Sequence, residues 1–223
     1  PLRAHHSSEA ITHSYTLALD LLPARNWQTC EGPGTGIKRD IIREGWKKYT
    51  VGRNSYCFGC AYGCSPLFRI NDGQYKGLVH DGPGTDPPAA LGSLCGHLDF
   101  PKNYDSLIYA DMLCVKYGMD PVSTGTAIAF AMECFERGYI TKKDTNDLDL
   151  AFGNMEAELE MIHRIAFRDT KLAYVLGEGV KRAAEKIGHN SIDFAAQVKG
   201  LEMAPFCPRG MQGLALTHAV STM

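Results

Sequence analysis

The stretch Tyr104–Arg137, YDSLIYADMLCVKYGMDPVSTGTAIAFAMECFER, decides the fold class of this chain. Its apolar residues recur every three or four positions, which is the spacing of one face of an α-helix. We therefore predict one helix over Tyr104–Tyr117 and a second over Val122–Arg137. Gly118 and Gly138 follow these two segments directly, and glycine is the usual residue just past the end of a helix.

The same helical period continues toward the C-terminus. Asn154 has a typical N-cap side chain and precedes a predicted helix over Glu156–Arg168. A fourth helix, interrupted by two glycines, is predicted over Leu172–Ile187. Ser191 is expected to cap a last helix over Ile192–Lys199. The predicted fold class is therefore mainly α.

Length and composition exclude several classes of protein. The chain has 223 residues, of which 44% are apolar, and a formal net charge of −2. No run of Lys or Arg indicates a nucleic-acid surface, and no apolar stretch approaches the roughly 18 residues of a membrane span. No signal-peptide pattern is present. The eight cysteines are clustered rather than spread as a disulfide framework, so we expect a reducing, cytoplasmic location. The first residue is Pro1, so we expect a piece of a longer protein.

The stretch Tyr56–Pro66, YCFGCAYGCSP, holds three of these cysteines at C-x2-C-x3-C spacing. Thiolates are soft ligands that suit iron-sulfur clusters and zinc. Zinc ribbons usually have two C-x2-C pairs, and the sequence has no second pair. Cys57, Cys60 and Cys64 are therefore predicted to bind a [4Fe-4S] cluster whose fourth ligand lies elsewhere. Zinc, disulfides and free thiols remain the alternatives.

Several ordered motifs together resemble the tungsten-containing aldehyde:ferredoxin oxidoreductases, from about Leu22 to the end of the chain. The motifs are Cys57-x2-Cys60-x3-Cys64, Gly82-Pro83, Tyr117–Gly125, Ile128–Cys134, Gly153-Asn154, Val198–Met203 and Pro208-Arg209. The resemblance implies a tungsten or molybdenum bis-pyranopterin close to a [4Fe-4S] cluster. It also implies oxidation of aldehydes to carboxylic acids, with ferredoxin or an electron-transfer subunit as acceptor.

The resemblance further implies how the chain is organised. Residues 1–188 would form a helical domain with the cluster loop, and 189–223 the truncated start of a further helical domain. The other domains of the enzyme would be partners. The cluster ligands would be Cys57, Cys60 and Cys64, with the fourth cysteine beyond Met223. The pterin-contacting residues would be Tyr117, Gly118, Met119 and Asp120.

The sequence departs from the family pattern at three places. The first acid of the pterin-contacting motif is Val115 here, which removes one expected hydrogen bond. The family's G-P-E-Y-E segment is replaced by one in which Asp86 is the remaining candidate for the acid that takes a proton near the metal. Tyr109 and Met112 replace the Glu and His of a subunit-bridging metal site, so no bridging iron is expected.

Cys95 has two interpretations. It could ligate tungsten directly, as in the benzoyl-CoA reductase branch of the family, or it could be a buried small apolar residue. Ligation would favour a low-potential reductase subunit acting on an acyl substrate. A cluster-only electron-transfer or scaffold subunit is a third possibility. Cys114 and Cys134 are predicted to lie in the core, and His218 is expected either there or at the substrate.

Overall fold

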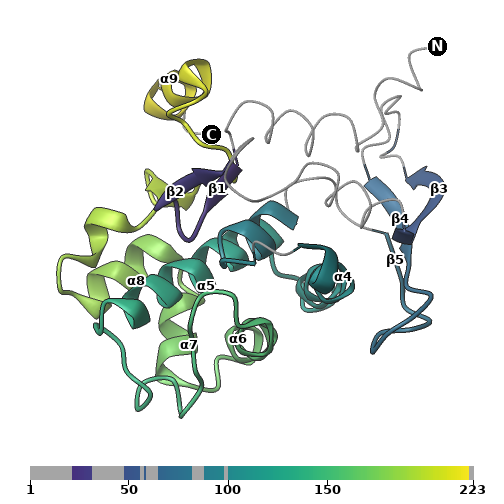
Figure 1. Cartoon of the computed structure of the whole chain (residues 1–223). Coiled ribbons are helices and arrows are strands. Elements are labelled where there is room, and N and C mark those ends of the chain that lie inside the picture. The colour runs from purple at the N-terminus through teal and green to yellow at the C-terminus, as the bar shows by residue number, and fades with distance from the viewer. Residues whose placement is uncertain are drawn as a thin grey trace.

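The computed structural model describes residues 22–31, 48–55, 58, 65–81, 88–97 and 100–220 (Figure 1). The described helices are α4 (Phe100–Lys116), α5 (Pro121–Glu136), α6 (Met155–Phe167), α7 (Lys171–Leu176), α8 (Val180–Ile187) and α9 (Gln212–Val220), with a π-helix η2 (Pro88–Ser93) and a 3-10 helix η3 (Ser191–Phe194). The strands are β1 (Leu22–Ala24), β2 (Thr29–Glu31), β3 (Thr50–Ser55), β4 (Ser65–Arg69), β5 (Val79–Asp81), β6 (Gln197–Val198) and β7 (Leu201–Glu202). The described part of the chain is mainly helical, as predicted.

Helix α5 forms the centre of the main core. Twelve of its sixteen residues are buried, including Ile128, Phe130 and Met132. Helices α4, α6, α7 and α8 and the π-helix η2 all contact it directly. Because α5 is apolar on all sides, it can be stable only inside such a ring of neighbouring elements.

Local signals set the helix ends where the sequence predicted them. Asn154 caps α6, since its side chain accepts a hydrogen bond from the backbone N–H of Ala157 at 3.2 Å. Gly118 and Gly138 follow α4 and α5 with φ angles of 71° and 73°, a conformation that glycine adopts without a Cβ penalty. These three expectations are confirmed.

Two expectations for the C-terminal part are wrong in detail. Leu172–Ile187 forms two helices instead of one, because Gly179 has a φ of 92° and breaks the segment before α8. Ile192–Lys199 is not a helix: a short 3-10 turn precedes the β6–β7 hairpin. Ser191 does not cap a helix there, since its Oγ donates to the Ala184 carbonyl at 3.1 Å. Tertiary contacts therefore override the local helical pattern in this segment.

A three-stranded antiparallel sheet in the order β3-β4-β5 packs on one side of α4, opposite the other helices (Figure 1). A small second core joins sheet and helix, with Phe68 and Ile70 of the sheet region against Tyr104 and Ile108 of α4. Tyr49, just before β3, stacks on Tyr104 with the ring centroids 6.2 Å apart. Helix α4 is thus buried on two faces, between the sheet and the main core.

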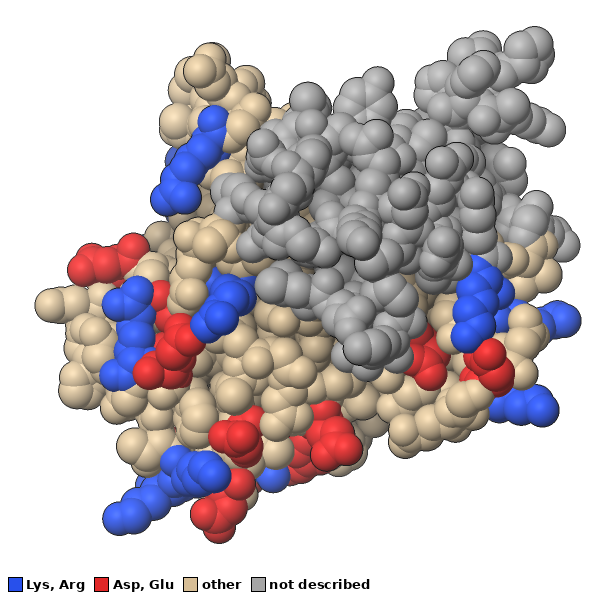
Figure 2. Space-filling view, in the orientation of Figure 1, with Lys and Arg blue, Asp and Glu red and all other residues tan. Residues whose placement is uncertain are grey.

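Acidic and basic side chains are interspersed over the helical part of the face seen in Figure 2. Glu178, for example, pairs with both Arg168 and Arg182. Among the described residues, no helix is both long enough and apolar enough to span a bilayer.

Candidate functional site

The three-stranded sheet brings the two loops with predicted functional residues to one end. Ser55 pairs with Ser65 across the β3–β4 hairpin, so residues 56–64 form the loop that joins these two strands. Leu67 pairs with Asp81, so β5 ends beside the start of β4. Residues 82–87 therefore leave the sheet at the same end as the hairpin loop.

The predicted cluster ligands Cys57, Cys60 and Cys64 and the predicted acid Asp86 belong to these two loops. All four lie outside the described residues, and their roles stay predictions. Phe58, between the cysteines, is described and fully exposed. Within the described part of the chain, no group of three or more His, Cys, Asp and Glu side chains could hold a metal ion.

The predicted pterin-contacting loop joins α4 to α5. The N–H of Met119 donates to the Cys114 carbonyl at 2.9 Å, and Gly118 takes a left-handed conformation, so the loop closes α4 in a regular helix-ending turn. Asp120 then caps α5, since its Oδ2 accepts from the N–H of Ser123 at 2.6 Å. The ring of Tyr117 instead turns to α6, where it contacts His163 and Phe167. A structural role accounts for each of these contacts, and pterin binding by the loop stays a prediction.

A buried pair missed in the sequence joins this helix to the sheet. His80 Nε2 of β5 lies 2.7 Å from Asp111 Oδ2 of α4, and both side chains are less than 10% exposed. Burial raises the pKa of Asp111, although the hydrogen bond from His80 opposes that effect. A sequence signal did exist: Asp111 lies seven residues after Tyr104, on a helix face that is otherwise apolar.

Cys95 lies in the core, with a fully buried side chain. Its Sγ is 3.5 Å from the Gly125 carbonyl and 3.8 Å from the Ala90 carbonyl, which are acceptors for a thiol proton. Burial raises the pKa of Cys95 well above its usual value, and the nearby Glu158 carboxylate raises it further. These surroundings favour the thiol over the thiolate that binds metals. Tungsten ligation by Cys95 stays a prediction.

Glu158 has a second buried contact that sequence reasoning did not identify. Its Oε2 lies 2.6 Å from His97 Nε2, and both side chains are almost completely buried. Burial raises the pKa of Glu158, while His97 acts in the opposite direction. Cys114 and Cys134 are fully buried, which confirms their predicted core placement. His218 of α9 is also buried.

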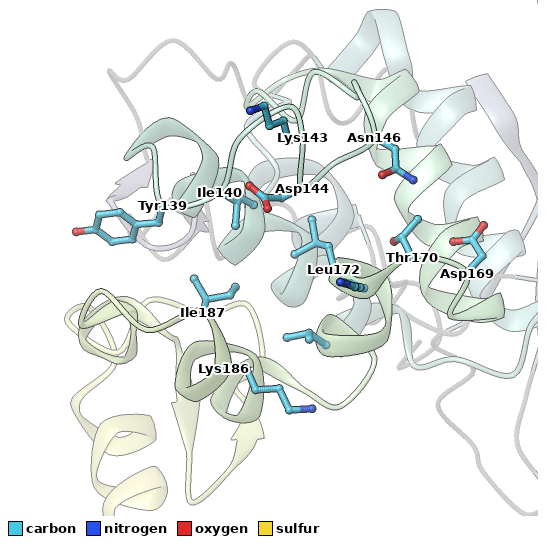
Figure 3. Close-up of a pocket in the computed structure, with 12 residues that line it drawn as sticks. Tyr139, Ile140, Lys143, Asp144, Asn146, Asp169, Thr170, Leu172, Lys186 and Ile187 are labelled. Atoms are coloured by element: carbon cyan, nitrogen blue, oxygen red, sulfur yellow. The ribbon is translucent and has the colours of Figure 1, made fainter.

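The largest described pocket lies away from these loops. Its volume is about 620 Å³, and it lies between the segment after α5, the start of α7 and the end of α8 (Figure 3). Lys143 and Lys186 project at its rim, and Ile140, Leu172 and Ile187 form its apolar part. No predicted site residue lines it. A second pocket of about 570 Å³, between α4 and α6, includes Tyr117.

From residue 7 to residue 223 the chain matches the family described as aldehyde ferredoxin oxidoreductase, domains 2 and 3. The chain belongs to this family. It is 34% identical over 206 residues to the tungsten-containing aldehyde ferredoxin oxidoreductase of Thermococcus kodakarensis, and 35% identical over 208 residues to that of Pyrococcus horikoshii. Each match covers 90% of this chain and 31% of the relative, so this family member spans about a third of the length of those enzymes.

More distant relatives belong to the same group. This aldehyde ferredoxin oxidoreductase chain is 29% identical over 189 residues to the aliphatic sulfonate oxidoreductase, WOR-like subunit, of Pyrococcus furiosus, covering 80% of this chain and 28% of the relative. Its fold is similar to that of the active-site complex BamBC of benzoyl coenzyme A reductase, with a TM-score of 0.68 and 20% identity. That match covers 89% of this chain and 29% of the solved chain.

Proposed function

We propose that this chain is part of a tungsten or molybdenum bis-pyranopterin oxidoreductase that oxidises aldehydes to carboxylic acids. Its electrons would pass through a [4Fe-4S] cluster to ferredoxin or an electron-transfer subunit. The observation that carries the proposal is the strand register, Ser55 with Ser65 and Leu67 with Asp81. This register directs the three-cysteine loop and the Asp86 loop out of one end of a single sheet, as a cluster beside a catalytic acid requires.

The donor set of the hairpin loop fits an iron-sulfur cluster. Three thiols lie in nine residues, and the paired Ser55 and Ser65 hold the two ends of that loop together. Thiolates are the usual ligands of such clusters. Cys57, Cys60 and Cys64 would therefore supply three ligands to one cluster with little further ordering of the chain.

In the oxidation, an aldehyde and water give a carboxylic acid, two protons and two electrons. The bound metal–pterin group would supply the two-electron chemistry. The carboxylate of Asp86 would take a proton released from the substrate. Tyr117, Gly118, Met119 and Asp120 would hold the pterin at the junction of α4 and α5. Since Val115 replaces the family acid and is half exposed, that side of the junction offers no carboxylate.

The surroundings of Cys95 favour oxidation over the reductive alternative. A benzoyl-CoA-reductase-like subunit would use Cys95 as a thiolate ligand to the metal, whereas burial and Glu158 both favour the protonated thiol. The cluster-only electron-transfer or scaffold subunit remains the rival from another class. It differs from the enzyme in metal content.

The chain would act with the remaining domains of the same enzyme and with a small aldehyde substrate in the cytoplasm. We propose residues 1–188 as the helical domain and 189–223 as the start of the next one. The side chains of Phe194 and Ala195 pack on the main core, so the first residues beyond this boundary lie against the helical domain.

Elemental analysis of the anaerobically purified complete protein tests the proposal. About four iron atoms and one tungsten or molybdenum atom per polypeptide are expected, with aldehyde oxidation measured against a viologen acceptor. Cys60→Ala should lower the iron content, whereas Cys134→Ala, a change at a buried core cysteine, should not. Iron without tungsten or molybdenum would support the electron-transfer subunit, and zinc alone would contradict the cluster.

A further inference from the structure

The buried pair His80–Asp111 occupies a specific place in the interface between the sheet and α4. Along β5 only His80 is buried, while Val79 and Asp81 are exposed on either side of it. Across the sheet His80 pairs in register with Phe68, which packs against Tyr104 of α4. His80 therefore lies on the sheet face that meets the helix, and its ring reaches Asp111 at 2.7 Å.

Asp111 completes one face of α4. Tyr104, Ile108 and Asp111 follow each other at helical spacing and all are buried toward the sheet. The other contacts of the second core are apolar or aromatic stacking contacts, which depend weakly on direction. A buried hydrogen bond between a histidine and a carboxylate is directional, and one buried polar pair can select a single packing register.

The pair connects two parts of the proposed site. On the sheet side, β5 ends one residue after His80, beside the base of the β3–β4 hairpin whose loop holds the three cysteines. On the helix side, Asp111 lies five residues before the end of α4, where the Tyr117–Asp120 loop begins. Movement of the sheet along α4 would change the distance between these two loops.

We propose that His80 and Asp111 are positioning residues: their hydrogen bond fixes the cluster-bearing sheet in register on α4, and so sets the environment of the cluster relative to the pterin loop. The inference rests on the proposed function only for the identity of the cluster. Hydrogen bonds to the cluster sulfurs and solvent exposure both tune a reduction potential, so a loosened sheet should change that potential as well as the stability.

The test compares apolar and polar replacements in the complete, anaerobically purified protein. His80→Leu and Asp111→Leu remove the hydrogen bond, whereas His80→Gln and Asp111→Asn can retain it. Ile108→Val is the matched control, because it removes one buried methylene group from the same interface and leaves the pair intact. Three readouts apply: the rate of cluster loss to an iron chelator, the cluster midpoint potential, and backbone hydrogen exchange in β3 and β4.

Both leucine variants are expected to lose the cluster about tenfold faster than the wild type. They should also change the oxidised-to-reduced ratio at a fixed potential by about tenfold, which corresponds to about 59 mV for a one-electron couple. The Gln and Asn variants should behave like the wild type, and so should Ile108→Val. If Asp111→Leu does not fold, the comparison of His80→Leu with His80→Gln decides the matter.

Leucine variants that match Ile108→Val in all three readouts would overturn the proposal. A wild-type protein without iron would contradict the proposed function instead. In that case hydrogen exchange still tests the pair: faster exchange in β3 and β4 of the leucine variants alone would support it, and unchanged exchange would refute it.

Discussion

Gly125 of α5 lies directly against the backbone of Ala90 in the π-helix η2. A Cβ at position 125 would lie 2.6 Å from the Ala90 carbonyl carbon and 2.7 Å from its oxygen. Backbone atoms cannot turn aside as a flexible side chain can, so only glycine allows this approach. The contact fixes the segment that follows residues 82–87 on the central helix of the core.

Gly125→Ala should therefore lower the free energy of unfolding by roughly 1–3 kcal/mol, because overpacking forces the backbone of η2 or α5 to shift. Urea unfolding measures the change. Gly213→Ala is the control, since nothing lies within 4 Å of a Cβ there and alanine is the better helix former by about 0.5–1 kcal/mol. A Gly125→Ala protein as stable as the wild type would show that η2 can move away from α5 at no cost.

The N-cap bond from Asp120 to the N–H of Ser123 predicts a stability effect that is separate from any cofactor contact. Asp120→Ala should lower the free energy of unfolding by about 1 kcal/mol, whereas Asp120→Ser should retain most of it, because serine also caps helices. Thermal unfolding of the two variants gives this comparison.

The same two variants separate the structural role of Asp120 from its proposed pterin contact. Asp120→Ser keeps the cap but has no carboxylate, so we expect it to hold less tungsten or molybdenum per polypeptide than the wild type. Full metal content in a well-folded Asp120→Ser protein would exclude the carboxylate as a cofactor contact.

Three buried thiols should resist alkylation. Burial raises the pKa values of Cys95, Cys114 and Cys134, in the last case to about 12, and only the thiolate reacts rapidly. In the native protein at pH 8 we expect no labelling of these three residues by iodoacetamide over a period that fully labels them in urea. Peptide mass spectrometry locates the label.

Labelling also tests the metal-ligand interpretation of Cys95. A thiol protected by burial alone should stay unreactive after the metal is removed, provided that the fold is kept. Labelling of Cys95 after metal removal, with Cys134 still protected in the same sample, would instead show that the metal had covered it.

Asp144 predicts a pH dependence of stability. Its Oδ2 accepts hydrogen bonds from the N–H and the hydroxyl of Thr141, and these bonds lower the pKa of Asp144 below its ordinary value. A lowered carboxyl pKa contributes stability above the pKa of the unfolded chain, about 3.9, and this contribution is lost as the pH falls through the folded-state pKa.

Asp144→Ala should thus reduce the free energy of unfolding at pH 7 by less than about 1 kcal/mol, since the group is exposed to solvent. The difference from the wild type should narrow as the pH falls below about 4. Urea unfolding at pH 7, 5 and 3 measures it, with the exposed Asp149→Ala as control. A difference that stays constant down to pH 3 would show that the stabilisation does not depend on the charge of Asp144.

Helix ends such as Gly118 and the Asn154 cap were predictable from sequence because they depend on residues within one turn. The family motifs were readable for a similar reason: each is a short run of neighbouring residues. The prediction failed at Ile192–Lys199, where the β6–β7 hairpin and contacts with α5 and α8 outweigh a weak local preference for helix.

The sequence by itself determined the helical class, the main helices and the family. Only the tertiary structure decided that His80 meets Asp111 across 31 positions, that Cys95 is enclosed by carbonyl groups beside Glu158, and that two distant loops leave one end of a sheet. The physical reason is that helix period and caps arise from local backbone hydrogen bonds, whereas buried polar pairs and strand register depend on which distant surfaces pack together.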